Sequence, residues 1–180
     1  MIKNIKINNR FSMDNIIRMH GSDFPYKHWY LISIYGDDGE YCTDVNLKFL
    51  KNVGLQGYLS LKFYDVTEED YKDLHKRYPQ IILFNDGMAK QVIKFLDKVQ
   101  KDETDSNLLV HCSAGISRSG AVGTFACDYC GLEYNKFIKE NKFIMANQFV
   151  LSMLRKNAGM FNFDEEHDGI DKVDAGSILI

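Results

Sequence analysis

The 180-residue sequence contains no apolar run near the ~20 residues that would span a bilayer. Its first six residues also lack the apolar block and the small-residue cleavage site of a secretory signal. The formal net charge of −3 gives no reason to expect a nucleic acid or an anionic membrane as partner, so any basic site must be local. These absences predict a cytoplasmic protein that binds neither nucleic acid nor membrane.

Cysteine is scarce, with four residues at positions 42, 112, 127 and 130. Without an export signal, we expect reduced thiols and no disulfide framework. Cys127 and Cys130 form a C-x-x-C pair, which invites a redox interpretation. However, they lie in an apolar, helix-like run with no second cysteine pair or histidine set nearby, so they are interpreted as core thiols. Cys42 is predicted to be structural.

The composition, 45% apolar and 26% charged, is that of an ordinary globular protein. There is no internal repeat, low-complexity linker or second domain. We therefore expect one catalytic domain over residues 1–160, followed by an acidic tail over 161–180. The predicted fold class is α/β, with a central, mostly parallel sheet of four to five strands flanked by helices.

Apolar periodicity gives the expected elements. Strands are predicted at 2–7, 29–35, 58–63 and 108–110, the last fully apolar as in the centre of a parallel sheet. Helices are predicted at 12–20, 88–101, 132–140 and 147–156, with further helix starts at Thr67 and near Arg118. Tyr78-Pro79 predicts a helix end, and Asp86 is the predicted N-cap of the helix over 88–101.

The segment from His111 to Gly120 predicts an anion site. A buried strand ends at Cys112, a loop of small residues follows, and a helix begins near Arg118. Backbone N–H groups of such a loop converge on one point, and the helix N-terminus adds its positive end. We therefore expect a phosphate group to be bound by the following loop residues: Ser113, Ala114, Gly115, Ile116, Ser117 and Arg118.

The same segment predicts a nucleophile. The helix N-terminus and a neighbouring cation favour the thiolate of Cys112. Arg118 offers a planar grip on two phosphoryl oxygens, which lysine does not. Ser119 is placed to donate its hydroxyl to the Cys112 sulfur, which would help sulfur leave. The alternative, a core thiol beside a surface arginine, is disfavoured by the preceding strand and by the Ala-Gly and Arg-Ser-Gly composition.

The string His111-Cys112-(five residues)-Arg118 resembles the H-C-x5-R signature of the cysteine-based protein tyrosine phosphatase superfamily, especially its dual-specificity and compact tyrosine phosphatase branches. The resemblance implies a phosphatase-type P-loop and a protein phosphatase that works through a phosphocysteine intermediate. Its substrate would be phosphotyrosine alone, or phosphotyrosine together with phosphoserine and phosphothreonine. The resemblance implies no metal and no cofactor, and a phosphorylated protein or peptide as partner. It assigns supporting roles to His111 and to Asn147, which opens a later helix.

The mechanism that the resemblance implies also requires an aspartic acid to protonate the leaving oxygen. Asp65 follows the predicted strand at 58–63 and is the preferred residue, with Asp86 in reserve. Three other functions stay open: a phosphate-binding module without turnover, a phosphatase of a lipid or other non-protein ester, and a sulfurtransferase-type loop. Trp29, Tyr35 and Tyr64 are candidates to line the pocket, although aromatic residues beside strands more often belong to the core.

Overall fold

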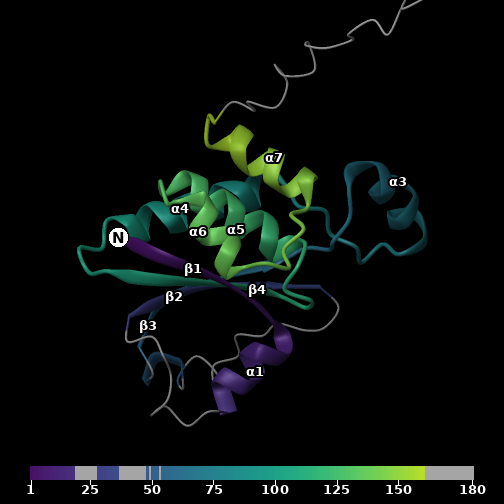
Figure 1. Cartoon of the computed structure of the whole chain (residues 1–180). Coiled ribbons are helices and arrows are strands. Elements are labelled where there is room, and N and C mark those ends of the chain that lie inside the picture. Colours follow the sequence, from purple (N-terminus) through teal and green to yellow (C-terminus); the bar gives the residue numbers. More distant parts are fainter. Residues whose placement is uncertain (19–27, 37–47, 49, 53, 161–180) are drawn as a thin grey trace, which may run out of the picture.

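The strands form one parallel sheet whose carboxyl edge carries the segment singled out above. The computed structural model describes residues 1–18, 28–36, 48, 50–52 and 54–160 (Figure 1). Within these residues the sheet has four strands in the order β1-β4-β2-β3, with every neighbouring pair parallel. The strands are β1 (Ile2–Asn9), β2 (Trp29–Tyr35), β3 (Leu55–Lys62) and β4 (Ser106–Cys112). The predicted α/β domain with a mostly parallel sheet is confirmed.

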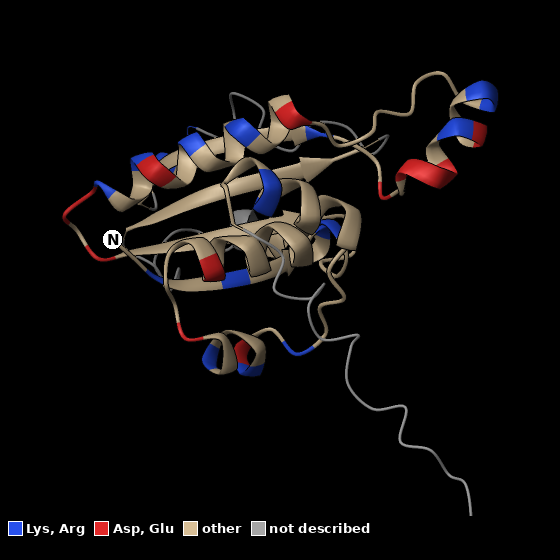
Figure 2. Cartoon of the chain, turned by 90° about the horizontal axis from the view of Figure 1, so that it is seen from above, with Lys and Arg blue, Asp and Glu red and all other residues tan. Residues whose placement is uncertain are grey.

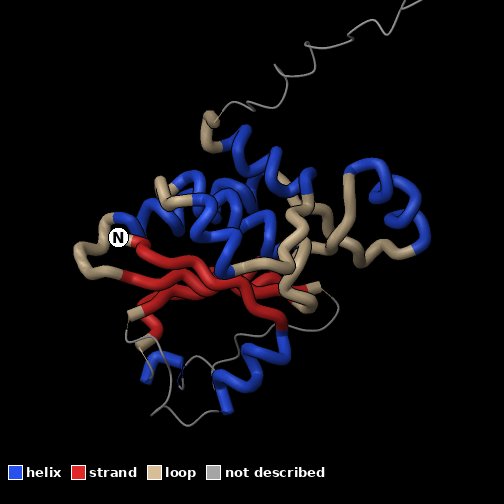
Figure 3. Tube along the Cα trace, in the orientation of Figure 1, coloured by secondary structure: helices blue, strands red, loops and turns tan. Residues whose placement is uncertain are grey.

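Helices cover both faces of this sheet. Figure 3 shows α4 to α7 on one face of the strands and α1 on the other, with α3 set to one side. The described helices are α1 (Arg10–Arg18), α3 (Glu68–Arg77), α4 (Asp86–Gln100), α5 (Arg118–Tyr129), α6 (Tyr134–Glu140) and α7 (Gln148–Asn157). In the described part of the chain, none of them combines the length and the apolar composition needed to cross a membrane.

The core is built around β4 and α5. β4 lies between β1 and β2, and α5 is buried throughout residues 119–127. This helix is so close to β1 that a Cβ at Gly123 would lie 2.3 Å from Cδ1 of Ile7. Glycine at this position therefore permits α5 to pack directly on the strand. Burial of both elements fixes the junction between them, where Cys112 ends one and Arg118 begins the other.

Several predicted boundaries differ from the observed ones. β3 begins at Leu55, three residues before the predicted strand, and α1 begins at Arg10 instead of residue 12. Asp86 is not the N-cap of α4, because Asn85 holds that position and its Oδ1 accepts the N–H of Met88 at 3.1 Å. Asp86 instead lies in the first turn, where its negative charge interacts favourably with the helix dipole. Cys42 and the predicted tail over 161–180 lie outside the described residues.

The C-x-x-C pair does not have the features of a reactive redox pair. Cys127 is buried in the core, Cys130 is half-buried against it, and both are free thiols. Burial raises the pKa of Cys127 to about 11 and the pKa of Cys130 to about 12. Both thiols are therefore protonated at neutral pH, and protonated thiols are poor nucleophiles. The interpretation of these residues as core thiols agrees with their burial.

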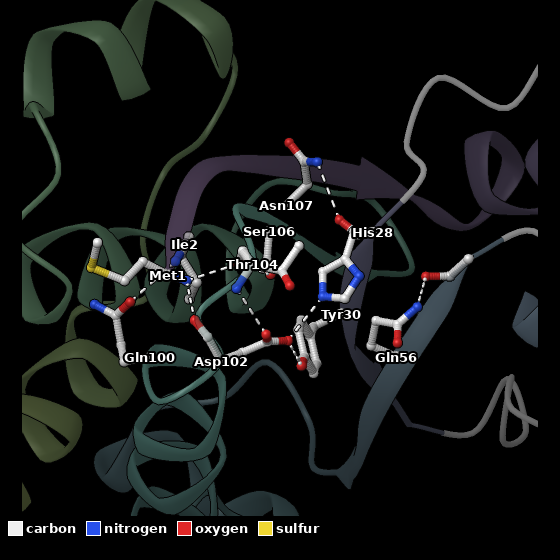
Figure 4. A network of polar contacts seen from close by, with 11 residues as sticks. Met1, Ile2, His28, Tyr30, Gln56, Gln100, Asp102, Thr104, Ser106 and Asn107 are labelled. Atoms are coloured by element: carbon white, nitrogen blue, oxygen red, sulfur yellow. Dashed lines mark hydrogen bonds and ion pairs between the residues drawn. The ribbon is translucent and has the colours of Figure 1, made fainter.

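A polar network closes the opposite edge of the sheet, where β2 and β4 begin (Figure 4). Oδ2 of Asp102 accepts the Tyr30 hydroxyl at 2.5 Å and lies 2.8 Å from Nε2 of His28. Its other oxygen accepts the N–H of Thr104 at 3.0 Å. The hydrogen bond from Tyr30, then that from His28, lowers the pKa of Asp102. Burial, together with the carboxylate, raises the pKa of Tyr30 to about 12.

This network predicts a loss of stability in acid. The pKa of Asp102 is lower in the folded chain than in the unfolded chain. The ionised carboxylate therefore stabilises the folded chain in full above about pH 4. The contribution is lost as the pH falls through the lowered pKa. We expect Asp102→Asn to reduce the free energy of unfolding at pH 7 and to flatten its decline below pH 4. Urea unfolding at a series of pH values measures this, and an unchanged acid decline in the variant would exclude Asp102 as its source.

Candidate active site

The loop that joins Cys112 to Arg118 lies at the carboxyl edge of the sheet. Asn9, the last residue of β1, pairs with Cys112, so β1 and β4 end side by side. Gly115 has a φ of +71°, and a Cβ there would lie 2.7 Å from the backbone nitrogen of Asn9. Glycine is therefore required both by the backbone conformation and by the contact with β1. The loop is held closed against the first strand.

Three loop carbonyls accept hydrogen bonds from the surrounding chain. The Ser113 oxygen accepts from N–H of Arg10 at 3.1 Å, and the Ile116 oxygen accepts from N–H of Met145 at 3.2 Å. The Ser117 oxygen accepts from N–H of Asn147 at 3.2 Å and from α5 at Ala121. In a trans peptide the C=O and the following N–H point in opposite directions. The N–H groups of residues 114, 117 and 118 therefore point away from these supports, as an anion-binding loop requires.

The Cys112 sulfur is buried at the base of this loop with two hydrogen-bonding neighbours. Its Sγ lies 3.1 Å from Oγ of Ser119 and accepts the N–H of Gly115 at 3.3 Å. The N-cap residue of α5, Ser117, makes no side-chain hydrogen bond to the helix. The first N–H groups of α5 consequently have no side-chain cap and stay available to an anion above the sulfur.

The Arg118 side chain is fixed by two hydrogen bonds. Its Nη1 donates to the backbone oxygen of Phe63 at 2.9 Å, and its Nη2 donates to Oγ of Ser113 at 3.0 Å. Gly36, just past β2, lies beside Nη1 and leaves room for the guanidinium. Among the described residues no acceptor contacts Nε, which is buried. Two strand ends thus position Arg118 while donors remain for an oxyanion.

The structure brings Asp65 to the loop. Its Oδ1 accepts the Ser117 hydroxyl at 2.7 Å and the Asn147 side-chain amide at 2.8 Å. Asn147 also accepts the N–H of Val150 and so caps α7. The carboxylate is exposed, which leaves it accessible to a substrate in the loop. Asp65, Ser117 and Asn147, which the sequence analysis named separately, form one hydrogen-bonded group.

Asp86 lies away from this group. Its Oδ1 accepts the side-chain amide of Asn157, the last residue of α7, at 2.8 Å. Asn147 lies at the other end of the same helix, and ten residues of α-helix span about 15 Å. The two candidate carboxylates are therefore separated by approximately the length of α7, with only Asp65 beside the loop.

The remaining sequence candidates lie at different depths. His111 is buried in β4, one residue before Cys112. Trp29 is fully buried at the start of β2, away from the loop, and belongs to the core. Tyr35 and Tyr64 are half-buried where β2 ends and just beyond β3, near Gly36. Sequence reasoning missed the Phe63 carbonyl and Gly36, although their positions at strand carboxyl ends were a usable signal.

Comparisons with known proteins agree with this geometry. Residues 83–166 match the family model described as protein-tyrosine phosphatase. The crystal structure of Tk-PTP in the active form has a TM-score of 0.50 and 13% identity, covering 88% of this chain and 94% of that chain. A mutant form of the same protein has a TM-score of 0.50 and 15% identity, with coverage of 88% and 93%. These structures show the shared fold.

A third solved structure is the human tyrosine phosphatase-like serine/threonine/tyrosine-interacting protein. It has a TM-score of 0.46 and 17% identity, covering 83% of this chain and 84% of that chain. A comparison with curated proteins found no match. The family match includes the loop and Asn147 but begins after Asp65, so the position of Asp65 rests on the structure alone.

Proposed function

We propose that this chain is a member of the cysteine-based protein tyrosine phosphatase superfamily, whose family model matches residues 83–166, and that it hydrolyses phosphotyrosine in proteins or peptides through a phosphocysteine intermediate. The observation that carries the proposal is the loop itself, with the Cys112 sulfur at its base and Arg118 fixed beside it. The free thiols suit a reducing compartment, so we place the reaction in the cytoplasm.

The first proposed step transfers the phosphoryl group to sulfur. The Cys112 thiolate attacks phosphorus in line with the leaving oxygen, so that an S–P bond forms as the P–O bond breaks. The loop N–H groups and Arg118 bind the three remaining phosphoryl oxygens and offset their negative charge. The protonated carboxyl of Asp65 gives its proton to the departing phenolic oxygen. The exposed position of Asp65 above the loop supports this role.

The second proposed step returns the enzyme to its starting state. A water molecule loses a proton to the Asp65 carboxylate and attacks phosphorus, and the S–P bond breaks to release inorganic phosphate. Sulfur leaves with the bonding electrons as a thiolate. Ser119, whose Oγ lies 3.1 Å from the sulfur, donates its hydroxyl hydrogen to that thiolate. The contact between these two side chains favours Ser119 acting in this step.

Phosphate release from matched substrates tests the proposal. One peptide is prepared with phosphotyrosine, with phosphoserine and with phosphothreonine, and a phosphoinositide in mixed micelles is assayed beside it. We expect the largest kcat/KM for phosphotyrosine, and unchanged rates in EDTA because Arg118 and the loop amides carry out the charge stabilisation. A larger kcat/KM for the phosphoinositide would contradict the proposed substrate class, and release from none of them would contradict hydrolysis itself.

A further inference from the structure

A groove of about 390 Å³ opens beside the phosphate loop. One wall is the end of β1, and the opposite wall is the end of α6 and the turn that follows it. Residues 114–116 of the loop line the groove as well. The loop therefore borders the groove as well as the Cys112 sulfur. Any chain that extends from a phosphate bound in the loop toward this side must enter the groove.

The groove carries local positive charge on a chain whose net charge is −3. Lys6, Lys139 and Lys142 line it, against a single carboxylate from Glu140. The Lys6 ammonium group donates to the backbone oxygen of Glu140 at 3.2 Å. Because that acceptor is an uncharged carbonyl, the contact does not neutralise the positive charge of Lys6. Within the described ranges, no carboxylate forms an ion pair with Lys139 or Lys142. The balance of lysine over glutamate favours an anionic occupant.

The groove also exposes apolar surface. The Phe143 side chain is 84% exposed and lines the groove together with Ile116, which is 38% exposed. Met145, 76% exposed, follows closely and bonds through its N–H to the Ile116 oxygen. Exposed aromatic and apolar side chains grouped at one place characterise surfaces that bind a partner. A free phosphate or another small anion does not use such a surface, whereas a peptide does.

We propose that this groove binds the substrate residues next to the phosphorylated residue and selects acidic segments. An extended peptide rises about 3.3 Å per residue, so the first two or three positions beside the phosphotyrosine reach the groove. Asp or Glu side chains there contact Lys139 and Lys142, and the Phe143 ring contacts the peptide backbone and apolar groups. The inference rests on the proposed function, because it takes a phosphate seated in the loop as its starting point.

Peptide binding to the full-length Cys112→Ser protein tests the groove without turnover. Fluorescence anisotropy compares a phosphotyrosine peptide flanked by Glu with the same peptide flanked by Gln. We expect the Glu peptide to bind about tenfold more tightly, a difference of about 1.4 kcal/mol that two exposed ion pairs can supply. Added salt should reduce this ratio. Lys139→Glu/Lys142→Glu should abolish or reverse it, whereas Phe143→Ala should weaken both peptides alike.

The matched control is Lys94→Glu/Lys98→Glu on α4, two exposed lysines that do not line the groove. It makes the same charge change outside the groove, and the ratio should survive in it. The proposal is wrong if the unaltered groove shows no preference, if the preference survives in the Lys139/Lys142 variant, or if the control loses it equally. It is also wrong if phosphoinositide vesicles bind through these lysines and the peptides do not.

The wild-type protein on p-nitrophenyl phosphate separates the two proposals, because this small ester does not extend into the groove. Turnover without any peptide preference would contradict the groove alone. A clear preference without turnover would contradict the proposed hydrolysis and leave the groove as a binding site for acidic phosphopeptides.

Discussion

Cys112→Ser is expected to reduce kcat by about 10³-fold or more, since the proposed nucleophile is replaced by a hydroxyl group that is far less readily ionised than a thiol. The N–H groups of the loop and the guanidinium of Arg118 are untouched, so binding of a phosphate analogue such as tungstate should persist. Steady-state kinetics on p-nitrophenyl phosphate and calorimetric titration with tungstate measure the two effects. Together they separate loss of the nucleophile from loss of the anion site.

Cys130→Ser is the matched control for that experiment. Cys130 is a half-buried thiol just past α5, and its pKa is raised to about 12 by burial. The same sulfur-to-oxygen change there should leave both the rate and tungstate binding close to wild type. If instead the Cys112 variant kept more than about one per cent of the activity, covalent catalysis by Cys112 would be excluded.

Asp65→Asn is expected to reduce kcat by about 10²- to 10⁴-fold on an ester with a poor leaving group such as phenyl phosphate. The amide oxygen can still accept from Ser117 and Asn147, so the local contacts remain while the transferable proton is lost. The defect should be much smaller on p-nitrophenyl phosphate, because that leaving group needs less protonation. The ratio of the two defects is the measurement that identifies a general acid.

Asp86→Asn tests the other carboxylate. Asp86 contacts Asn157 and lies in the first turn of α4, so its loss should lower the melting temperature slightly and leave the dependence on leaving group unchanged. A leaving-group-dependent defect in Asp86→Asn, with none in Asp65→Asn, would reverse the assignment. No such defect in either variant would indicate a loop that binds phosphate without the proposed acid catalysis.

The loop itself was predictable from the sequence because its determinants are local. A strand that ends at Cys112, the small residues after it and the helix start at Arg118 are contiguous, and the structure has them in that order. The position of Asp65 was predictable for a different reason. Parallel strands place their carboxyl ends at one edge, so a residue just past β3 comes near a residue at the end of β4.

Contacts between distant segments were not predictable in the same way. The N–H of Met145 supports the oxygen of Ile116, and Phe63 supports Arg118 from 55 residues away. The apolar periodicity of the sequence does not show which turn packs beside the loop, because that depends on how α6 and α7 pack on the sheet. The predicted N-cap of α4 was wrong by one residue. Asn85 and Asp86 are both good caps, and local propensity does not distinguish adjacent positions.

The segment that carries α3 is a place where the chain should tolerate an insertion. Tyr64 donates its N–H to the Ile82 oxygen at 2.9 Å, so the chain leaves and re-enters the domain at one place, and Phe84 packs on Phe63. The helix in between buries no residue and lies outside the layers, with its acidic turn first and its basic turn last (Figure 2). A fluorescent reporter could therefore be spliced into α3 while the strands and Asp65 keep their places.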